Sequence, residues 1–216
     1  MVTVLSQNFS LVNSWINELR NVETQNNRAN FRKSMERIGE IAAFEISKGL
    51  EFKEIEISTP LDKIMVKEIA VQPVITTILR AGVPLFEGIL NYFDKADCGF
   101  VAAYRKHDAN DYFSIKQDYL TCPSVDGRPL IVADPMLATG ASLLEALKNL
   151  LNHETPSQLH IVAVIASKQG VETLSNAFPD AHIWVGAIDE NLTSKGYISP
   201  GLGDAGDLSY GQKLQR

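Results

Sequence analysis

The sequence predicts an α/β fold: a doubly wound, mainly parallel five-stranded sheet flanked by helices, with a small hood built from the N- and C-terminal segments. Three observations predict it. From residue 71 onward, short apolar runs alternate with helix-like segments. The runs are almost continuously apolar, as expected for parallel strands that are covered on both faces. Several runs also end directly at polar residues, which is where open α/β sheets bind their ligands.

The segment before residue 71 is expected to be largely helical. Residues 10–20 suit a short helix, and FKEIEIST (52–59) alternates like an exposed strand that Pro60 ends. A longer helix is predicted within residues 27–50. There, apolar residues recur at helical spacing before Gly49, a stripe most simply explained by packing on a core: Phe31, Met35, Ile38, Ala42 and Ile46.

The predicted sheet strands follow in order along the chain. They are VITTIL (74–79), FVAAY (100–104), LIVA (130–133), HIVAVIAS (160–167) and HIWVGAI (182–188). The carboxyl ends of parallel strands meet at one edge of a sheet. The polar residues at those ends are therefore expected to face a common crevice: Arg80, Arg105, Asp134, Ser167 and Lys168.

A single domain spanning residues 1–216 is predicted, because the length suits one domain and no linker or repeat interrupts the chain. Residues 1–70 are expected to form the N-terminal helical and hood segment, 71–190 the parallel-sheet core, and 191–216 the C-terminal hood loop. Since both terminal segments fall outside the alternation of strands and helices, they are expected to build a smaller layer over the sheet edge.

Composition excludes several classes of protein. The formal net charge is −6 and no cluster of Lys and Arg stands out, which argues against a nucleic-acid partner. Cys98 and Cys122 form no CxxC pair and the four histidines are scattered, so neither a disulfide framework nor a metal motif is predicted. The N-terminus lacks the pattern of a signal peptide, and no apolar run approaches the ~20 residues of a membrane span. A cytoplasmic protein without a membrane partner is expected.

The loop DPMLATGAS (134–142) carries the clearest chemical signal. Small residues open the helix that follows, and the N–H groups at a helix N-terminus lack internal partners and suit a phosphate. Gly140 allows the backbone to come close, and the hydroxyls of Thr139 and Ser142 can donate further hydrogen bonds. The Asp134 carboxylate repels a phosphate but can accept hydrogen bonds from sugar hydroxyls. A phosphorylated sugar is therefore the predicted ligand.

Two familiar phosphate cradles are absent from this sequence. It contains no Walker-type GxxxxGK loop, and no GxGxxG fingerprint follows an early strand. On its small residues alone, the stretch is explained equally well as a plain strand-to-helix turn with Ser or Thr as the cap. Further motifs are needed to decide between the two explanations.

Those further motifs resemble one enzyme family. DPMLATGAS resembles the phosphoribosyl-diphosphate loop of the type I phosphoribosyltransferases, and its Asp-Pro-Met-Leu-Ala-Thr-Gly form resembles the uracil phosphoribosyltransferases in particular. The tail KGYISPGLGDAGD (195–207) resembles the uracil-binding segment of that family nearly letter for letter. ILRAG (78–82), YR (104–105) and FRKSMERIGEIAAFE (31–45) match further family motifs in the expected order. The resemblance covers most of the chain.

The resemblance implies a glycosyltransferase of pyrimidine salvage. The family transfers ribose 5-phosphate from 5-phospho-α-D-ribose 1-diphosphate (PRPP) to N1 of uracil and forms UMP and pyrophosphate. Magnesium (Mg2+) assists and is held mainly through the substrate. The implied PRPP contacts are Arg80, Arg105, Asp204 and the loop residues Asp134, Pro135, Met136, Leu137, Ala138, Thr139, Gly140, Ala141 and Ser142. The implied uracil contacts are Asp204 and the main chain of Ile198, Gly203 and Ala205, and the implied catalytic residues are Asp204, Arg80 and Arg105.

The chemistry of these residues agrees with those roles. Guanidinium forks suit phosphate oxygens and help a pyrophosphate leave, although an isolated arginine is more often a solvated ion-pair partner. Uracil presents an acceptor, a donor and an acceptor at O2, N3–H and O4, and the backbone of a glycine-rich loop can match that pattern. Cytosine would leave buried polar groups unpaired, which can cost ~10⁴-fold in discrimination. A carboxylate at Asp204 can stabilise a cation-like ribosyl transition state.

Several points stay open in the sequence. The polar stretch 105–128 suits a lid that excludes water, a hairpin arm that reaches a partner subunit, or an ordinary surface hairpin. DYFSIKQDYL, ASKQG and GDLSYGQKLQR depart from the usual family pattern, so lid contacts and activation by a GTP effector are undecided. The family suggests a homodimer or a larger homo-oligomer. The alternatives are a phosphoribosyltransferase for another base and a catalytically idle RNA-binding regulator on the same fold. The tail argues against the first and the acidic charge against the second.

Overall fold

A computed structural model describes residues 1–107 and 113–213, with the backbone alone for residues 103–107 and 113–118. Its centre is a sheet with the strand order β1-β10-β9-β7-β4-β5-β6, in which β8 also pairs with β9. Every described strand pair in this sheet is parallel except β5 with β6. The strands are β1 (Val2–Val4), β4 (Val74–Leu79), β5 (Asp97–His107), β6 (Phe113–Thr121), β7 (Pro129–Ala133), β8 (Met136–Leu137), β9 (Gln158–Ser167) and β10 (His182–Asp189).

The five predicted parallel strands are confirmed as β10, β9, β7, β4 and β5, side by side at the centre of the sheet. Two edge strands lie outside the prediction. β1 runs parallel to β10, and β6 runs antiparallel to β5. A strand of three residues carries too little pattern to be recognised, and β1 is defined only by its pairing with residues 183–185.

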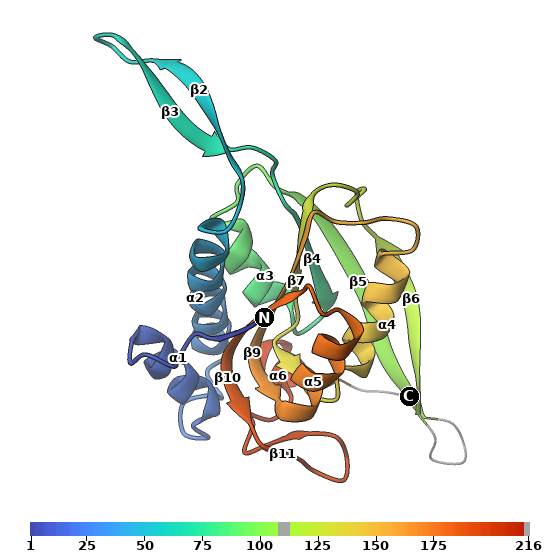
Figure 1. Cartoon of the computed structure of the whole chain (residues 1–216). Helices are drawn as coiled ribbons and strands as arrows, with labels where there is room; N and C mark the ends of the chain where they lie inside the picture. Colours follow the sequence, from blue (N-terminus) through green and yellow to red (C-terminus); the bar gives the residue numbers. More distant parts are fainter. Residues whose placement is uncertain (108–112, 214–216) are drawn as a thin grey trace.

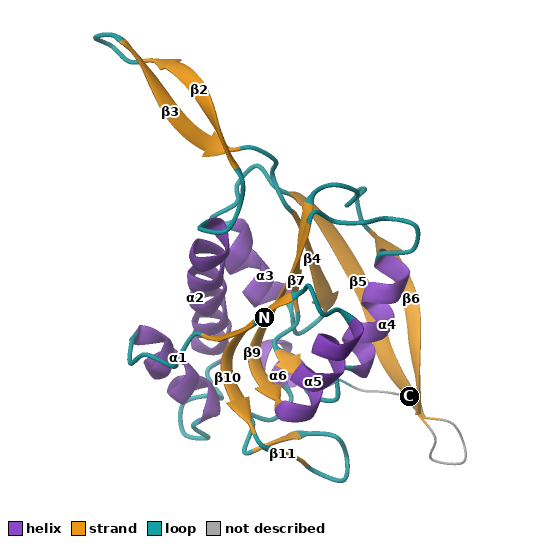
Figure 2. Ribbon diagram, in the orientation of Figure 1, coloured by secondary structure: helices purple, strands orange, loops and turns teal. Residues whose placement is uncertain are grey.

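Helices cover both faces of the sheet, as a doubly wound fold requires (Figure 2). On one face these are α1 (Leu11–Arg20), α2 (Arg28–Ser47) and α3 (Val83–Leu90), and on the other α4 (Ala141–Leu150) and α5 (Lys168–Ala177). Because successive strand residues point to opposite faces, Ile75 enters the first core and Val74 the second. This two-sided burial explains the continuously apolar strands. No helix among the described residues has the length and apolar character to cross a membrane.

A hairpin arm projects from the body of the molecule (Figure 1). It consists of β2 (Phe52–Ser58) and β3 (Lys63–Ile69), which pair antiparallel along their whole length. The predicted exposed strand is therefore confirmed as one half of this arm, and Pro60 lies in the turn that ends it. The N–H of Thr59 closes the turn by donating to the carbonyl of Asp62 at 2.8 Å.

The polar stretch after the second predicted strand forms another hairpin. β5 continues to His107 instead of ending at residue 104, and β6 pairs with it antiparallel. The prediction that Arg105 marks a strand end was wrong, because the residue pairs with Ile115 inside the ladder. The last three residues of β5 are polar, but they remain in a strand because β6 supplies backbone hydrogen-bond partners. The side chain of Arg105 and residues 108–112 lie outside the described residues, so the lid and partner-arm alternatives stay predictions.

The N- and C-terminal segments contact one another, and we call the region where they meet the hood. Its C-terminal half contains β11 (Asn191–Leu192), β12 (Ile198–Ser199) and α6 (Ala205–Tyr210). α6 packs against α2, where the Arg32 guanidinium donates to the carbonyl of Ser209 at 2.7 Å. The N-terminal segment is not wholly separate from the core, since β1 belongs to the main sheet.

Two of the scattered histidines come together on β9 and β10. Trp184 Nε1 donates to His160 Nδ1 at 3.2 Å, so the proton of the neutral His160 ring sits on Nε2, 3.0 Å from Gln158 Oε1. His182 stacks on Trp184 with the ring centroids 3.8 Å apart. Burial lowers the pKa of His160 from 6.5 to about 4, with a further contribution from His182.

Stability is expected to fall on acidification as His160 titrates. Its folded pKa lies below its unfolded value, so between pH 6.5 and about 4 the unfolded chain binds a proton that the folded chain does not. Lowering the pH across this window should remove up to ~3 kcal/mol of unfolding free energy. Urea unfolding at several pH values measures the loss. An His160→Asn variant keeps an acceptor for Trp184 but does not titrate, so an equal pH slope in both proteins would contradict the assignment.

Candidate functional site

The carboxyl edge of the sheet positions the predicted strand-end residues, but not all of them as expected. Arg80 follows β4 and Asp134 follows β7. Ser167 ends β9 and is fully buried, and its hydroxyl donates to the Ala138 carbonyl while accepting from the N–H of Gly170. Lys168 pairs with Glu190 at 2.6 Å. Ser167 therefore supports the neighbouring loop instead of facing an open crevice, because its backbone position already caps α5.

Residues 134–142 run from β7 over β8 into α4, and most of them line a hollow of about 60 Å³. Gly140 takes a left-handed conformation (φ 79°) at the N-terminus of α4, where no side chain caps the helix. The N-cap residue is Gly140 and not Ser or Thr as in the alternative explanation, although Thr139 Oγ1 accepts from the N–H of Ala141 at 3.3 Å. The first turn of α4 therefore offers backbone donors to an anion.

Asp134 lies at the start of the same loop. Its Oδ1 accepts from the N–H of Met136 at 3.3 Å, which holds the carboxylate over the loop that contains it. The side chain also borders the small hollow. An acid is thus fixed beside a set of backbone donors, which is the arrangement predicted for a sugar that carries a phosphate.

Arg80 connects the sheet edge to the C-terminal tail. The peptide bond that precedes it is cis. Its Nη2 lies 3.3 Å from Asp207 Oδ1 and 3.5 Å from the carbonyl of Gly211. The side chain is 46% exposed and both contacts are long. The guanidinium can therefore exchange them for phosphate oxygens, which bind it more strongly.

Asp204 is held at the N-terminus of α6 by two donors. Its Oδ1 accepts from the N–H of Asp207 at 3.0 Å, and its Oδ2 lies 3.1 Å from the Lys213 ammonium. Burial raises the pKa of the Asp204 carboxyl, but the hydrogen bonds from Asp207 and Lys213 together outweigh it and leave the pKa below its usual range. The group is consequently a carboxylate at neutral pH.

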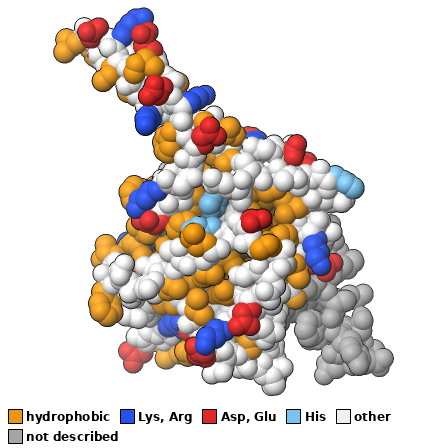
Figure 3. Space-filling view, viewed as in Figure 1, with side chains coloured by type: hydrophobic (Ala, Val, Ile, Leu, Met, Phe, Trp, Pro, Cys, Tyr) orange, Lys and Arg blue, Asp and Glu red, His pale blue; other side chains and the backbone are white. Residues whose placement is uncertain are grey.

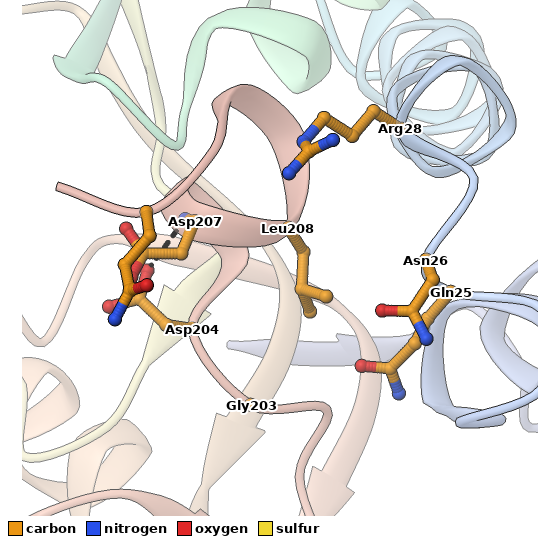
Figure 4. A pocket seen from close by; sticks show the side chains of 8 residues that line it. Gln25, Asn26, Arg28, Gly203, Asp204, Asp207 and Leu208 are labelled. Atoms are coloured by element: carbon orange, nitrogen blue, oxygen red, sulfur yellow. Dashed lines mark hydrogen bonds between the residues drawn. The ribbon is translucent and has the colours of Figure 1, made fainter.

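A larger hollow of about 370 Å³ lies between the two halves of the hood (Figure 4). Its lining residues are Gln25, Asn26 and Arg28 from the N-terminal half and Gly203, Asp204, Asp207, Leu208 and Gln212 from the C-terminal half. In Figure 4 the Arg28 side chain reaches from α2 toward α6. Sequence analysis did not name these lining residues as site residues: Gln25, Asn26, Arg28, Asp207, Leu208 and Gln212. No local pattern marks them, since only the packing of α2 against α6 brings them together.

The predicted uracil contacts lie in one short segment of the C-terminal half of the hood. The side chains of Ile198 and Ala205 are buried, at 5% and 2% exposed. Gly203 lies between them with a positive φ of 99° and borders the larger hollow. Because the apolar side chains turn into the core, the groups left to face a ligand from these three residues are main-chain N–H and C=O.

The acids available to a metal ion are Asp134, Asp204 and Asp207. Across residues 1–107 and 113–213, no three His, Cys, Asp or Glu side chains come close enough to form a metal site. Mg2+ is commonly bound by one or two carboxylates together with substrate phosphates and water. The carboxylates at this edge therefore fit a magnesium ion that binds together with a diphosphate.

Comparisons with known proteins give a consistent result. Residues 6–212 match the family model of uracil phosphoribosyltransferase. A uracil phosphoribosyltransferase from Porphyromonas gingivalis is 44% identical over 211 residues, 97% of this chain and 98% of the relative. One from Thermococcus gammatolerans is 40% identical over 204 residues, 93% of this chain and 89% of the relative. Among solved structures, the AQ2163 protein from Aquifex aeolicus matches with a TM-score of 0.89 at 31% identity and covers 100% of both chains.

Proposed function

Because the chain belongs to the uracil phosphoribosyltransferase family, we propose that the hollow of the 134–142 loop and the adjoining hood segment 198–205 hold the two substrates of that reaction. The enzyme transfers ribose 5-phosphate from PRPP to N1 of uracil, releasing pyrophosphate and forming UMP in pyrimidine salvage. The observation that best supports the proposed placement is the uncapped N-terminus of α4 beside Asp134.

The ribose 5-phosphate end of PRPP is assigned to the 134–142 loop. Its phosphate accepts from the N–H groups at the start of α4, and the hydroxyls of Thr139 and Ser142 lie in the same hollow. The Asp134 carboxylate accepts from ribose hydroxyls. Arg80 takes the diphosphate end, where its planar fork bridges two oxygens and stabilises the charge that develops on the leaving pyrophosphate. Arg105 is assigned the same role from the family motif alone.

Uracil is assigned to the main chain of Ile198, Gly203 and Ala205. Their fixed N–H and C=O groups supply the donor, acceptor and donor that O2, N3–H and O4 require, and the same pattern rejects cytosine. Asp204, ionised and held by the start of α6, is assigned to the ribose side of uracil. There its negative charge stabilises positive charge at C1 as the bond to pyrophosphate breaks.

Magnesium binding is proposed to involve Asp204 or Asp207 and the diphosphate. The ion neutralises charge on the diphosphate when it is bound. The protein itself orients the substrates: Arg80 positions the diphosphate of PRPP, and the hood residues position uracil relative to it.

A pyrophosphate-release assay tests the function. The enzyme is given PRPP and Mg2+ with uracil, cytosine, orotate, hypoxanthine or adenine in turn. Release with uracil alone is expected. Release with another base would keep the PRPP site but overturn the uracil assignment, and no release with any base would favour the RNA-binding regulator. Adding GTP to the same assay tests whether this chain has the effector response of some family members.

A homodimer or larger homo-oligomer is also proposed, with the β2–β3 arm as its contact. Paired residues of an antiparallel hairpin share a face, so Ile55, Ile57, Ile64 and Val66 form one apolar surface. Ile57 and Ile64 are 40% and 52% exposed, and an isolated two-stranded hairpin is only marginally stable in water. A second copy of the chain would cover this surface. Sedimentation analysis of wild type and of Ile64→Lys tests it: a wild-type monomer, or an unchanged oligomer in the variant, would count against the arm.

A further inference from the structure

We infer that the ion pair between Arg20 and Asp189 is a positioning device that fixes the uracil-binding main chain and thereby sets the affinity for uracil. The inference rests on the proposed function, because it takes residues 198–205 as the uracil site. Neither residue lines the two hollows. Both act through Gly201, which lies two residues before Gly203.

The contacts form a closed set of four. The Arg20 guanidinium binds the Asp189 carboxylate in a fork, Nη1 to Oδ2 and Nη2 to Oδ1, both at 2.8 Å. Nη1 also donates to the carbonyl of Gly201 at 2.9 Å. Asp189 Oδ2 accepts from the N–H of Gly201 at 2.9 Å. The ion pair therefore forms hydrogen bonds with both the N–H and the carbonyl of Gly201.

These contacts are sheltered from water, which strengthens them. The Asp189 side chain is 8% exposed and that of Arg20 is 22% exposed. The two residues come from well-fixed elements, since Arg20 ends α1 and Asp189 ends β10. The end of one helix and the end of one strand thus support a loop that has little regular structure of its own.

Position 201 requires glycine for its backbone conformation. Its φ is 57°, in the left-handed region, and a side chain there would collide with the backbone of Ile198. On either side, Ile198 and Leu202 are buried at 5% and 4% exposed and anchor the loop in the core. The apolar anchors hold the loop down, and the ion pair fixes its position along the sheet edge. Because Gly203 lies only two residues after Gly201, a shift at Gly201 displaces the main-chain N–H and C=O groups that are assigned to bind uracil.

The ion pair also reaches the opposite wall of the larger hollow. The carbonyl of Arg20 accepts from Gln25 Nε2 at 3.1 Å, and Gln25 lines that hollow. Arg20 therefore links both halves of the hood. Within residues 1–107 and 113–213, the Asp189 carboxylate bonds to Arg20 and Gly201 and makes no hydrogen bond to the 134–142 loop. The effect should consequently fall on uracil and spare PRPP.

The test is steady-state kinetics on Arg20→Lys and on Asp189→Asn. A lysine keeps the charge but cannot form the fork and the bond to Gly201 together. An asparagine keeps the size but loses one carboxylate acceptor. Misplacement of binding groups by a fraction of an ångström to 1 Å can cost up to ~100-fold. We expect KM for uracil to rise roughly tenfold or more in each variant, with KM for PRPP within about twofold of wild type.

Arg128→Lys is the matched control. Arg128 pairs with Asp97 at 2.7 Å through one nitrogen, donates to the carbonyl of Gln72 and is 24% exposed. Its own exposure resembles that of Arg20, although its partner Asp97 is 58% exposed. Arg128 lies at the amino end of the sheet. This variant should keep the wild-type KM for uracil. Equal KM values for uracil in Arg20→Lys, Arg128→Lys and wild type would overturn the inference.

Two further readouts keep the inference separate from folding and from the proposed function. Should either variant fail to fold, hydrogen exchange on the wild-type enzyme without ligand still decides. The amide of Gly201 should be protected by the Asp189 carboxylate, and exchange as fast as that of an open loop would overturn the inference. If wild type itself makes no UMP from uracil, the proposed function fails. If wild type is active and the variants keep its KM for uracil, the ion-pair inference alone fails.

Discussion

An Asp204→Asn enzyme is expected to fold normally and to lose roughly 100- to 1,000-fold in kcat. The carboxylate is ionised in the free enzyme, because hydrogen bonds from Asp207 and Lys213 outweigh the effect of burial and keep its pKa low. Asparagine retains an oxygen that can accept from the N–H of Asp207, and it is as good a helix cap as aspartate. What disappears is the negative charge beside the ribose carbon.

Thermal unfolding and kinetics together separate charge from folding. The midpoint of unfolding should change little, because the partner Lys213 is 46% exposed and exposed ion pairs contribute little stability. Asp97→Asn removes an acid of similar type at the far end of the sheet and serves as the control, with wild-type kcat expected. Full turnover in Asp204→Asn would remove Asp204 from the catalytic residues.

Arg80→Ala should reduce kcat/KM for PRPP by about 100-fold or more. The guanidinium is assigned two charge-assisted hydrogen bonds to the diphosphate, and each such bond contributes ~1.5–3 kcal/mol. In the free enzyme its contacts to Asp207 and Gly211 are long, at 3.3 and 3.5 Å, so their loss should barely affect folding. Arg80→Lys keeps the charge without the fork, and an intermediate loss is expected.

The assignment of Arg80 to the diphosphate is checked by comparing how its substitutions change the binding of PRPP and of uracil. Isothermal titration with PRPP in the presence of Mg2+ should show weakened binding in the order wild type, Arg80→Lys, Arg80→Ala. Uracil or UMP contacts made by residues 198–205 should be unaffected. An Arg80→Ala enzyme that binds PRPP as wild type does would show that Asp207 is the true partner of Arg80.

The sheet was predictable because its strands are buried on both faces. Val74 and Ile75 enter opposite cores, so neighbouring positions are both apolar and the strand is visible without any knowledge of its partners. β1 and the far part of β5 were not predictable for the converse reason. Val2–Val4 is too short to show a pattern, and Arg105 remains in a strand only because β6 pairs with it.

The candidate site likewise contains some residues that the sequence could predict and others that it could not. The 134–142 loop and the 195–207 tail were found because the chemistry resides in contiguous residues. Arg28 and Gln25 were missed because their role depends on packing between segments that are far apart in the chain. The same holds for Arg20 and Asp189, which lie 169 positions apart and meet only in the folded hood.

The edge strand β1 has a consequence for how the chain is made. Val2, Thr3 and Val4 pair with residues 183–185, and the N-terminal ammonium donates to the carbonyl of Ala181 at 2.9 Å. β1 is therefore synthesised roughly 180 residues before its partner β10, and it lacks that partner for ~10–40 s at typical rates of translation. Until then its backbone edge is unpaired and open to chaperones or to misassembly. The sheet acquires that edge only after β10 has been made, so a chain that stalls before residue 183 leaves β1 without its partner.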